Sequence, residues 1–506
     1  MSYKIPKEIL NVLERLEANG FEAYLVGGCV RDLLLNRKPK DWDATTNAKP
    51  EEIQKIFPDS FYENDFGTVG VITGSEDETL KAVEITPYRI EAKYTDKRHP
   101  DIVRFGDSLE EDLSRRDFTI NAMALLVSQS AYLRSDGASE ADDEILEEKF
   151  VEIRDPFGGK NDLKAKVIKT VGNPEDRFED DALRIMRAVR LAAEVGFEIE
   201  PETVKTIKEK SHLLKAISME RIRDEFSKLL MSASPKKGIE ETQEAGILKF
   251  VAPELEEGIG VGQNKEHIFT VWEHNLRALQ HAADKNFSLE IRMAALFHDI
   301  GKPRTKWGEG IESTFYSHEV VGAKMTVEIL SRLRYPKKFI EKVGKLVRWH
   351  LFFSDTDIIT LSAVRRLARN VGEENVWDLM NVRFCDRIGM GRPKEEPYRL
   401  RKYESMVEEA LRSPLNVSKL DIKGEDVMKA AAVEPGPKVG FILHALLEEV
   451  LDEPERNKKD YLSARSAELA KLPEEEIKAL GEEGKARKDE EEQKELSEIR
   501  KKYGVR

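Results

Sequence analysis

The chain has 506 residues, more than one hydrophobic core usually organises, so we expect several domains. Hydrophobic residues make up 40% and charged residues 35% of the chain, a composition that excludes a wholly disordered protein and suggests long solvated helices. Cys29 and Cys385 lie far apart in apolar contexts, which argues against a disulfide framework and favours the cytoplasm. No run approaches the roughly 20 apolar residues that span a bilayer, so we do not expect a membrane protein.

The net charge is 82 − 96 = −14, which argues against non-specific nucleic-acid binding over the whole surface but not against a local basic track. Between residues 205 and 237 nine Lys or Arg residues accompany four Asp or Glu residues, and between 332 and 348 seven accompany one. Each stretch is either a contact surface for RNA or an ordinary solvated helix face, and composition alone leaves both open.

The first sequence pattern that indicates a binding site lies near the N-terminus. Residues 21–26 (FEAYLV) are typical of a buried strand, Gly27 and Gly28 of a turn, and VRDLLL of a helix start. Paired glycines let the backbone approach a triphosphate, and the helix N-terminus adds unpaired N–H groups. Arg31 can add a bidentate phosphate contact. A tight turn without a ligand is the commoner meaning of Gly-Gly taken alone.

Two carboxylates follow in the segment KDWDATT. Asp41 and Asp43 are two residues apart in a predicted strand, so both side chains project from one face. Mg²⁺ prefers carboxylate oxygens and substrate phosphates, and two such ions can activate a 3′-hydroxyl and stabilise departing pyrophosphate. Glu84, in VEITPYR, is the expected third ligand from an adjacent strand. The alternative is a solvent-facing pair of aspartates on an edge strand.

Further strand-like runs continue a mixed α/β region to about residue 165, interrupted by an acidic segment, 128–148, that we expect to be a surface loop. Beyond residue 166 the periodicity is almost entirely helical, and beyond 455 charged residues predict an exposed helix or a partly disordered extension. The expected parts are a head (1–165), a helical neck (166–255), a metal-binding helical domain (256–392), a helical tail (393–455) and the charged extension (456–506).

The segment DDALRIMRAVR carries Asp181, Arg184, Arg187 and Arg190 at three-residue spacing, which predicts neighbours on one helix face. An aspartate can accept a hydrogen bond from the exocyclic amine of cytosine or adenine, while an arginine donates to the adjacent ring nitrogen. Guanine and uracil present a carbonyl instead, and a buried unpaired acceptor costs about 1–3 kcal/mol. The alternative is an ordinary salt-bridged amphipathic helix.

The motifs GGxVRD, D-x-D, SRRDFTINAMA and DPFGGKNDL occur in this order, and the chain thereby resembles the polymerase-β-like nucleotidyltransferases. Within them it is similar to the bacterial class II CCA-adding enzymes and the poly(A) polymerases. The resemblance implies an α+β fold: a mixed-sheet head followed by an all-helical neck, HD body and tail. It implies nucleotide binding by Gly27, Gly28, Arg31, Arg115, Arg116, Asp181, Arg184, Arg187 and Arg190.

More specifically, Asp181 and Arg184 match the family's base-reading EDxxR motif, and Arg187 and Arg190 its phosphate-contacting arginines. Residues 89–100 are similar to its flexible loop. One departure is Asp180, which stands where the family usually has Glu.

Six of nine histidines fall between residues 267 and 350, and ALFHDIGKP resembles the HD superfamily of metal-dependent phosphohydrolases. That resemblance implies a ligand set of His274, His298, Asp299 and Asp386, with His318 and His350 for a second metal. Mn, Fe, Ni, Co or Mg would suit these donors. Histidines seven apart, such as His267, His274 and His281, can instead simply line one helix face.

The expected function is therefore Mg²⁺-dependent addition of C and A nucleotides, from CTP and ATP, to the 3′ end of tRNA. The segment FPDSFYENDFGTVGVITG lacks the basic stretch associated with poly(A) polymerases, which favours tRNA. Alternatives are addition of CC only, of A only or of a poly(A) tail, an HD phosphohydrolase with an inactive head, and a non-enzymatic RNA chaperone. The oligomeric state stays open.

Overall fold

The computed structural model describes residues 2–62, 67–91, 103–106, 108–128, 144–264, 268–352, 358–412, 417 and 420–505. The chain forms two compact units. The first contains residues 1–348 and 385–391, and the second contains residues 349–384 and 392–506. Among the described residues no helix combines the length and the apolar surface that crossing a membrane requires.

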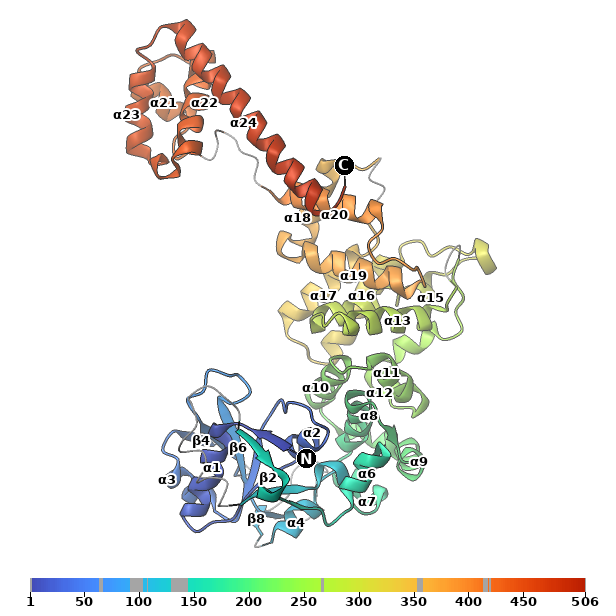
Figure 1. The fold of residues 1–506 in the computed structure, drawn as a ribbon. Coiled ribbons are helices and arrows are strands. Elements are labelled where there is room, and N and C mark those ends of the chain that lie inside the picture. The colour runs from blue at the N-terminus through green and yellow to red at the C-terminus, as the bar shows by residue number, and fades with distance from the viewer. Residues whose placement is uncertain are drawn as a thin grey trace. The chain divides into compact units, whose positions relative to one another are not determined.

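The first unit begins with a seven-stranded mixed sheet (Figure 1). Its strand order is β11 (Val151–Arg154), β9 (Ala124–Val127), β2 (Ala23–Val26), β3 (Asp43–Thr46), β6 (Ala82–Pro87), β5 (Val69–Ile72) and β4 (Ser60–Tyr62). Only the pairing of β3 with β6 is parallel, and the other pairs in this sheet are antiparallel. This confirms the α+β head that the sequence predicts.

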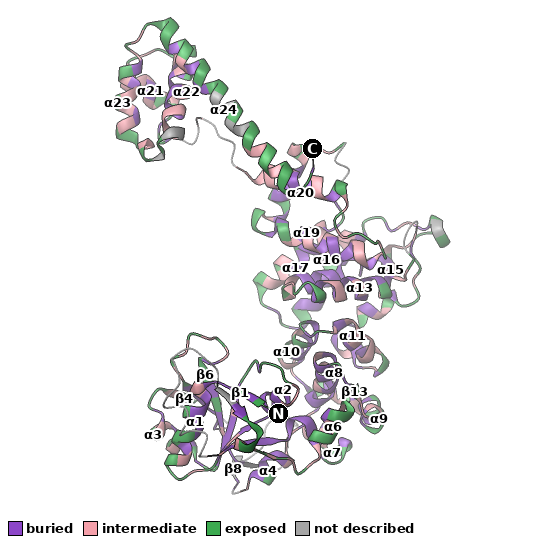
Figure 2. Cartoon of the chain, viewed as in Figure 1, coloured by how far each residue is buried: buried purple, intermediate pink, exposed green. Residues whose placement is uncertain are grey.

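Burial follows the period of two expected for a sheet with one covered face. In β6 the side chains of Val83 and Ile85 are buried, whereas Ala82 and Glu84 are exposed. The helix α1 (Lys7–Ala18) buries its apolar stripe, including Leu13 and Leu16, and contacts β2 and α3 (Pro50–Ile56). Figure 2 shows this head as a buried interior with exposed helix faces and turns.

Part of the acidic segment is a strand rather than a loop. Residues of β10 (Glu144–Glu147) pair antiparallel with β1 (Ser2–Ile5), and residues 129–143 lie outside the described part. The loop expected over residues 89–100 begins as β7 (Arg89–Glu91), which pairs with β8 (Val103–Phe105), and its residues 92–100 lie outside the described part.

The rest of the first unit is mainly helical, with one two-stranded parallel pair, β12 (Val167–Ile168) and β13 (Glu198–Ile199). Its head and neck helices are α2 (Gly28–Leu34), α4 (Leu109–Ser114), α6 (Gly159–Ala165), α7 (Pro174–Asp180), α8 (Leu183–Val195), α9 (Pro201–Lys210), α10 (Met219–Leu230), α11 (Pro235–Glu244) and α12 (Leu248–Val251). Its remaining helices are α13 (Val271–Asp284), α14 (Leu289–Phe297), α15 (Lys302–Thr305), α16 (His318–Arg332) and α17 (Lys337–Trp349), the last residue of which begins the second unit.

The second unit is helical in its described residues. It contains α18 (Leu361–Val371), the first part of α19 (Val376–Gly389), α20 (Tyr398–Leu411), α21 (Gly424–Ala431), α22 (Pro437–Asp452), α23 (Lys459–Leu469) and α24 (Glu474–Lys502). α22 starts with a proline, Pro437, directly after its N-cap Gly436.

The charged extension is helical, as expected, and much of α24 is exposed, but the extension also packs into a core. Leu462 and Leu469 of α23 and Ile477 of α24 are buried in one core with residues of α21 and α22. A Cβ on Gly481 would lie 2.6 Å from the Cα of Phe441, and one on Gly484 would lie 2.5 Å from the carbonyl oxygen of His444. These two glycines let α24 pack backbone to backbone on α22, so few apolar residues suffice to bury the contact.

Candidate functional site

The turn after β2 is held against a carboxylate and a guanidinium. Gly27 has φ +77°, which favours glycine, and a Cβ there would lie 3.1 Å from Arg116 Nη1 and 3.2 Å from Asp43 Oδ2. The next residues form α2, whose N-terminal N–H groups therefore begin beside these two charged side chains. The predicted Gly-Gly turn, Asp43 and Arg116 thus meet at one place.

The predicted metal carboxylates are neighbours through the sheet register. Asp43 pairs with Val26 of β2 on one side and with Glu84 of β6 on the other. The interpretation that Asp41 lies in the strand is wrong, because β3 begins at Asp43 and Asp41 is an exposed residue in the bend before it. Carboxylate oxygens at a strand start suit Mg²⁺. Among the described residues, Asp41, Asp43 and Glu84 do not form a group whose ligand atoms all lie within 4.8 Å of one another.

Arg31 is buried and already engaged by protein groups. Its side chain is 8% exposed, its Nε donates to Asp32 Oδ1 at 2.9 Å and its Nη1 donates to Asn121 Oδ1 at 3.0 Å. Asn121 belongs to the SRRDFTINA motif, so Arg31 joins the GGxVRD and SRRDFTINA motifs inside the head. Its Nη2 would lie 3.6 Å from a Cβ on Gly28, so the guanidinium packs against the glycine turn.

The two arginines of SRRDFTINA share one buried carboxylate. Arg115 donates to Asp112 Oδ1 from Nε at 2.9 Å and from Nη2 at 2.8 Å, and Arg116 Nη2 lies 3.3 Å from Asp112 Oδ2. Burial would raise the pKa of Asp112, but Arg116 and Arg115 outweigh it and lower that pKa below its ordinary value. Asp112 is therefore a fixed anion that orients both guanidinium groups.

The residues predicted to read the base do not all lie on one helix, and that expectation is wrong. Asp181 has extended backbone (φ −144°, ψ 105°) between α7 and α8, whereas Arg184 lies on α8 and is buried. Asp181 Oδ1 accepts a hydrogen bond from the N–H of Leu183 at 3.0 Å, and Arg184 Nη2 donates to the carbonyl oxygen of Arg115 at 3.0 Å. The break leaves Asp181 before the start of α8, while Arg184 on α8 contacts the head.

The neighbouring charges on α8 are paired with acids. Arg187 Nη2 lies 2.8 Å from Asp117 Oδ2, and Arg190 lies 2.7 Å from Glu194 and 2.8 Å from Glu225. Burial raises the pKa of Asp117, but Arg187 and Arg184 outweigh that and hold it below its ordinary value. Asp180, where the family usually has Glu, lies 3.4 Å from Arg177 and 3.6 Å from Arg184.

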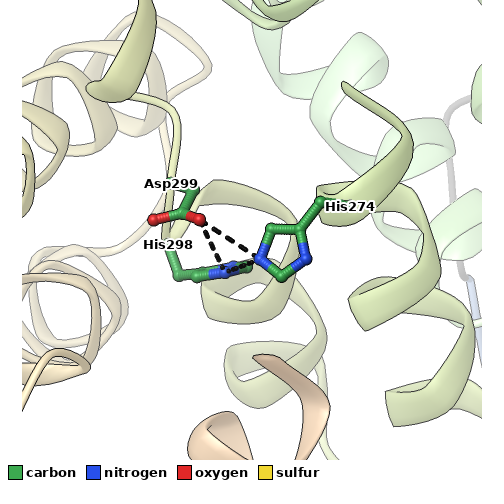
Figure 3. A group of neighbouring side chains, drawn as sticks. All are labelled: His274, His298 and Asp299. Carbon is green, nitrogen blue, oxygen red and sulfur yellow. Dashed lines mark hydrogen bonds and ion pairs between the residues drawn. The ribbon is translucent and has the colours of Figure 1, made fainter. Parts of the chain in front are cut away.

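A second cluster lies among the helices of the HD segment (Figure 3). His274 Nε2 on α13 is 2.8 Å from His298 Nε2, 3.2 Å from Asp299 Oδ2 and 3.3 Å from Asp386 Oδ1. All four residues are buried. The structure thus brings together the whole His274, His298, Asp299 and Asp386 set that the resemblance implies.

The imidazoles are oriented with Nε2 towards this cluster. His298 Nδ1 lies 2.8 Å from the carbonyl oxygen of Ala295, and His318 Nδ1 lies 2.7 Å from that of Phe315. Donation from Nδ1 leaves the Nε2 lone pair for a cation, and this donor set fits a divalent metal. Burial lowers the pKa of His298, but Asp299 and Asp386 raise it to about 10, so a proton would compete with a metal.

Two glycines permit the close packing of this cluster. A Cβ on Gly301 would lie 2.3 Å from the carbonyl oxygen of His318 and 2.6 Å from the N of Gly322. A Cβ on Gly389 would lie 2.9 Å from the carbonyl oxygen of His274. His318 Nε2 reaches 3.3 Å from Asp299 Oδ1. His350 is buried in the second unit, and His267 lies outside the described residues.

Comparison with known proteins assigns this arrangement to a family. The chain matches the Poly A polymerase head domain over residues 23–169, the probable RNA and SrmB-binding site of polymerase A over 196–259, and the HD domain over 267–396. It is 32% identical to the CCA-adding enzyme of Limosilactobacillus reuteri (strain DSM 20016), with 91% of this chain and 96% of that protein covered. The chain belongs to the CCA-adding enzyme family.

Other members of the CCA-adding enzyme family match in part or in fold. The CCA-adding enzyme of Ligilactobacillus salivarius is 42% identical over 250 residues, so the chain spans about half (54%) of that relative's length. The crystal structure of the Bacillus stearothermophilus CCA-adding enzyme in complex with CTP is similar with a TM-score of 0.55 and 28% identity. That similarity covers 91% of this chain and 96% of that one.

Sequence reasoning missed several residues of this family member's sites. Asp112, Asp117 and Arg221 are partners of predicted residues, and Arg221 Nη2 lies 2.7 Å from Asp181 Oδ2. Lys302 Nζ lies 2.5 Å from Asp299 Oδ2 and 2.6 Å from Gln263 Oε1. Lys302 and Asp112 had a local signal, since Lys302 follows Asp299, and Arg115 follows Asp112, by three residues, about one helical turn. Arg221 is 40 residues from Asp181 and had none.

Proposed function

We propose that this chain adds C and A nucleotides to the 3′ end of tRNA, from CTP and ATP, with release of pyrophosphate. One observation carries the proposal: Asp181 and Arg184, joined by a backbone hydrogen bond, lie at the start of α8, and the Arg184 guanidinium donates to the backbone of Arg115 in the head. A carboxylate acceptor and a guanidinium donor that reach one base would match the edge that cytosine and adenine share. It opposes the carbonyl that uracil and guanine present there.

The head residues suit the transfer step. The Gly27 turn and the start of α2 offer backbone N–H groups to a triphosphate, next to Arg116. Asp41, Asp43 and Glu84 would hold Mg²⁺, which lowers the barrier by activating the 3′-hydroxyl and stabilising the departing pyrophosphate. Asp112 keeps Arg115 and Arg116 in place while the nucleotide binds.

The test is incubation of the purified full-length protein with Mg²⁺ and one labelled nucleotide at a time. The acceptors are tRNAs that end before CCA, at CC and at CCA. We expect C and A incorporation that stops at CCA and is lost in Asp43→Ala. Incorporation of CC only, of A only or of a long A tail would support one of the alternative transferases. No incorporation at all would overturn the proposal.

A second activity is supported by the HD cluster. We infer that His274, His298, Asp299 and Asp386 bind a divalent metal, Mn, Ni, Co, Fe or Mg, and hydrolyse phosphate esters at RNA ends. RNA ending in a 2′,3′-cyclic phosphate, incubated with each metal in turn, should be converted to a phosphomonoester or a free hydroxyl. The reaction should fail in His298→Ala. Hydrolysis equal in wild type and variant would exclude this cluster as its site.

The location inferred for the protein is the cytoplasm. Both cysteines, Cys29 and Cys385, are buried free thiols. Burial raises the pKa of Cys29 to about 12, and Asp43 contributes to the shift. An inert thiol packed behind the glycine turn suits a reducing compartment.

A further inference from the structure

We propose that Arg221 is a positioning residue for nucleotide selection, because its guanidinium holds the Asp181 carboxylate in the orientation that accepts a base amine. The inference rests on the proposed function. Arg221 lies on α10, and its Nη2 donates to Asp181 Oδ2 at 2.7 Å. Their side chains are 28% and 18% exposed, so the pair is partly shielded from water.

Asp181 needs an outside partner because no helix fixes it. Its backbone is extended, so the carboxylate stands in the break between α7 and α8. Oδ1 accepts from the N–H of Leu183 and Oδ2 accepts from Arg221, which ties down both oxygens. A carboxylate oxygen has two acceptor sites, so each oxygen keeps one for an exocyclic amine. An ionised carboxylate has no proton to donate to the carbonyl of uracil or guanine.

The alternative is that this ion pair only docks α10 on α8. Docking has other sources: Ile222, Phe226 and Leu229 of α10 are buried, and Glu225, one turn after Arg221, lies 2.8 Å from Arg190 Nε on α8. Arg221 Nη1 is buried and has no hydrogen-bond partner within the part of the chain that the structure describes. Asp181 is therefore the main counter-charge of Arg221, and the pair's own task is to orient Asp181.

The test measures kcat/KM of the full-length protein for CTP against UTP on tRNA lacking CCA, and for ATP against GTP on tRNA ending in CC. We expect Arg221→Gln to lower each discrimination ratio by about tenfold or more, because the loosened carboxylate rejects the wrong carbonyl less well. Arg221→Lys keeps the charge and should recover part of the ratio. Lys228→Gln removes the same charge from an exposed site on α10 and should leave both ratios unchanged.

Two results would overturn the inference alone. One is an Arg221→Gln variant that loses rate equally with all four nucleotides, which is the signature of a structural role. The other is an undiminished effect of Arg221→Gln in an Asp181→Asn background, which would place its action elsewhere. A wild-type protein that incorporates no nucleotide would overturn the proposed function and this inference with it. Unfolding midpoints of all variants separate misfolding from altered selection.

Discussion

Two features of Gly27 require a glycine, its positive φ and its close approach to Arg116 and Asp43, and mutation can separate them. Its backbone (φ +77°, ψ −138°) is a conformation that costs an alanine about 1–3 kcal/mol, and the new Cβ would also press on Arg116 and Asp43 at 3.1 and 3.2 Å. We expect Gly27→Ala to lower nucleotide incorporation by about ten- to a hundredfold, because small displacements of reacting groups are costly. Single-nucleotide incorporation assays and the unfolding midpoint measure the two effects.

The matched control is Gly20→Ala. Gly20 has φ +85°, but nothing lies within 4 Å of a Cβ placed there. It should lose stability through backbone strain alone while keeping its activity. Equal loss of activity in both variants would show that backbone strain, not the close approach to Asp43 and Arg116, explains the glycine.

Asp112 ties the stability of the head to pH. Its pKa is lowered in the folded protein by Arg116 and Arg115 despite burial, so ionised Asp112 stabilises the fold at neutral pH. That contribution is fully present above the unfolded pKa of about 4 and disappears as the pH falls through the lower folded value. We expect Asp112→Asn to destabilise the head by about 1–3 kcal/mol at neutral pH, and by progressively less in acid.

Thermal unfolding of both proteins at neutral pH and at a series of pH values below about 4, where folded Asp112 titrates, measures this difference. Glu111→Gln removes an exposed charge from the same helix, α4, and should change little at any pH. A difference between wild type and Asp112→Asn that grows as the pH falls would contradict the assigned direction of the shift.

At this scale the sequence predicted residue types better than their partners. Motif order was enough to propose Asp43, Asp181 and His298 as candidate site residues, because carboxylate and imidazole groups suit the chemistry expected there. It could not select Arg221, because Arg221 is 40 residues from Asp181 and the pair is defined only by proximity in three dimensions.

Among the elements, the contact between α16 and the turn before α15 positions the residues of the HD cluster. Gly301 has φ −78°, so an alanine there is free of backbone strain, but its Cβ would lie 2.3 Å from the carbonyl oxygen of His318. We expect Gly301→Ala to push α16 away, to lengthen the 3.3 Å contact between His318 and Asp299, and to cost about 1–3 kcal/mol.

Metal content after loading with Mn²⁺ and desalting, together with the unfolding midpoint, checks this expectation. Gly262→Ala is the control, since no atom lies within 4 Å of a Cβ at that position. If Gly301→Ala bound as much Mn²⁺ as Gly262→Ala at the same stability, the glycine contact would not position the cluster.

Element boundaries show where sequence periodicity fails. Spacing placed Asp181 on a helix with Arg184, but α7 ends at Asp180 and the chain is extended before α8 begins at Leu183. Polar side-chain contacts there, with Leu183 and Arg221, compete with helical hydrogen bonds, and no local pattern reports them. Long amphipathic helices such as α13 were predictable because their apolar stripe repeats over several turns.

For the whole molecule, the charged extension belongs to a packed unit. Composition suggested a solvated tail because α24 has few apolar residues, but Gly481 and Gly484 let its backbone touch α22, and Ile477 is buried there. At the far end of α24, Lys502 Nζ and Tyr503 Oη each lie 2.7 Å from Glu408 Oε2 on α20. The last helix therefore joins α20 to the core of α21–α23 within the second unit.

Gly484→Val should break this packing. Valine is a better helix former than glycine, but here its Cβ would lie 2.5 Å from the carbonyl oxygen of His444, so the steric cost should win. We expect faster hydrogen exchange over 437–502, with exchange over 23–46 unchanged because that segment belongs to the other unit. The control is Gly440→Val, because Gly440 is exposed and no atom lies within 4 Å of a Cβ placed there. This variant gains helix propensity without a steric cost, so its hydrogen exchange should stay as slow as in wild type. Since the two variants make the same chemical change, unchanged exchange in Gly484→Val would mean that α24 is the solvated helix its composition suggested.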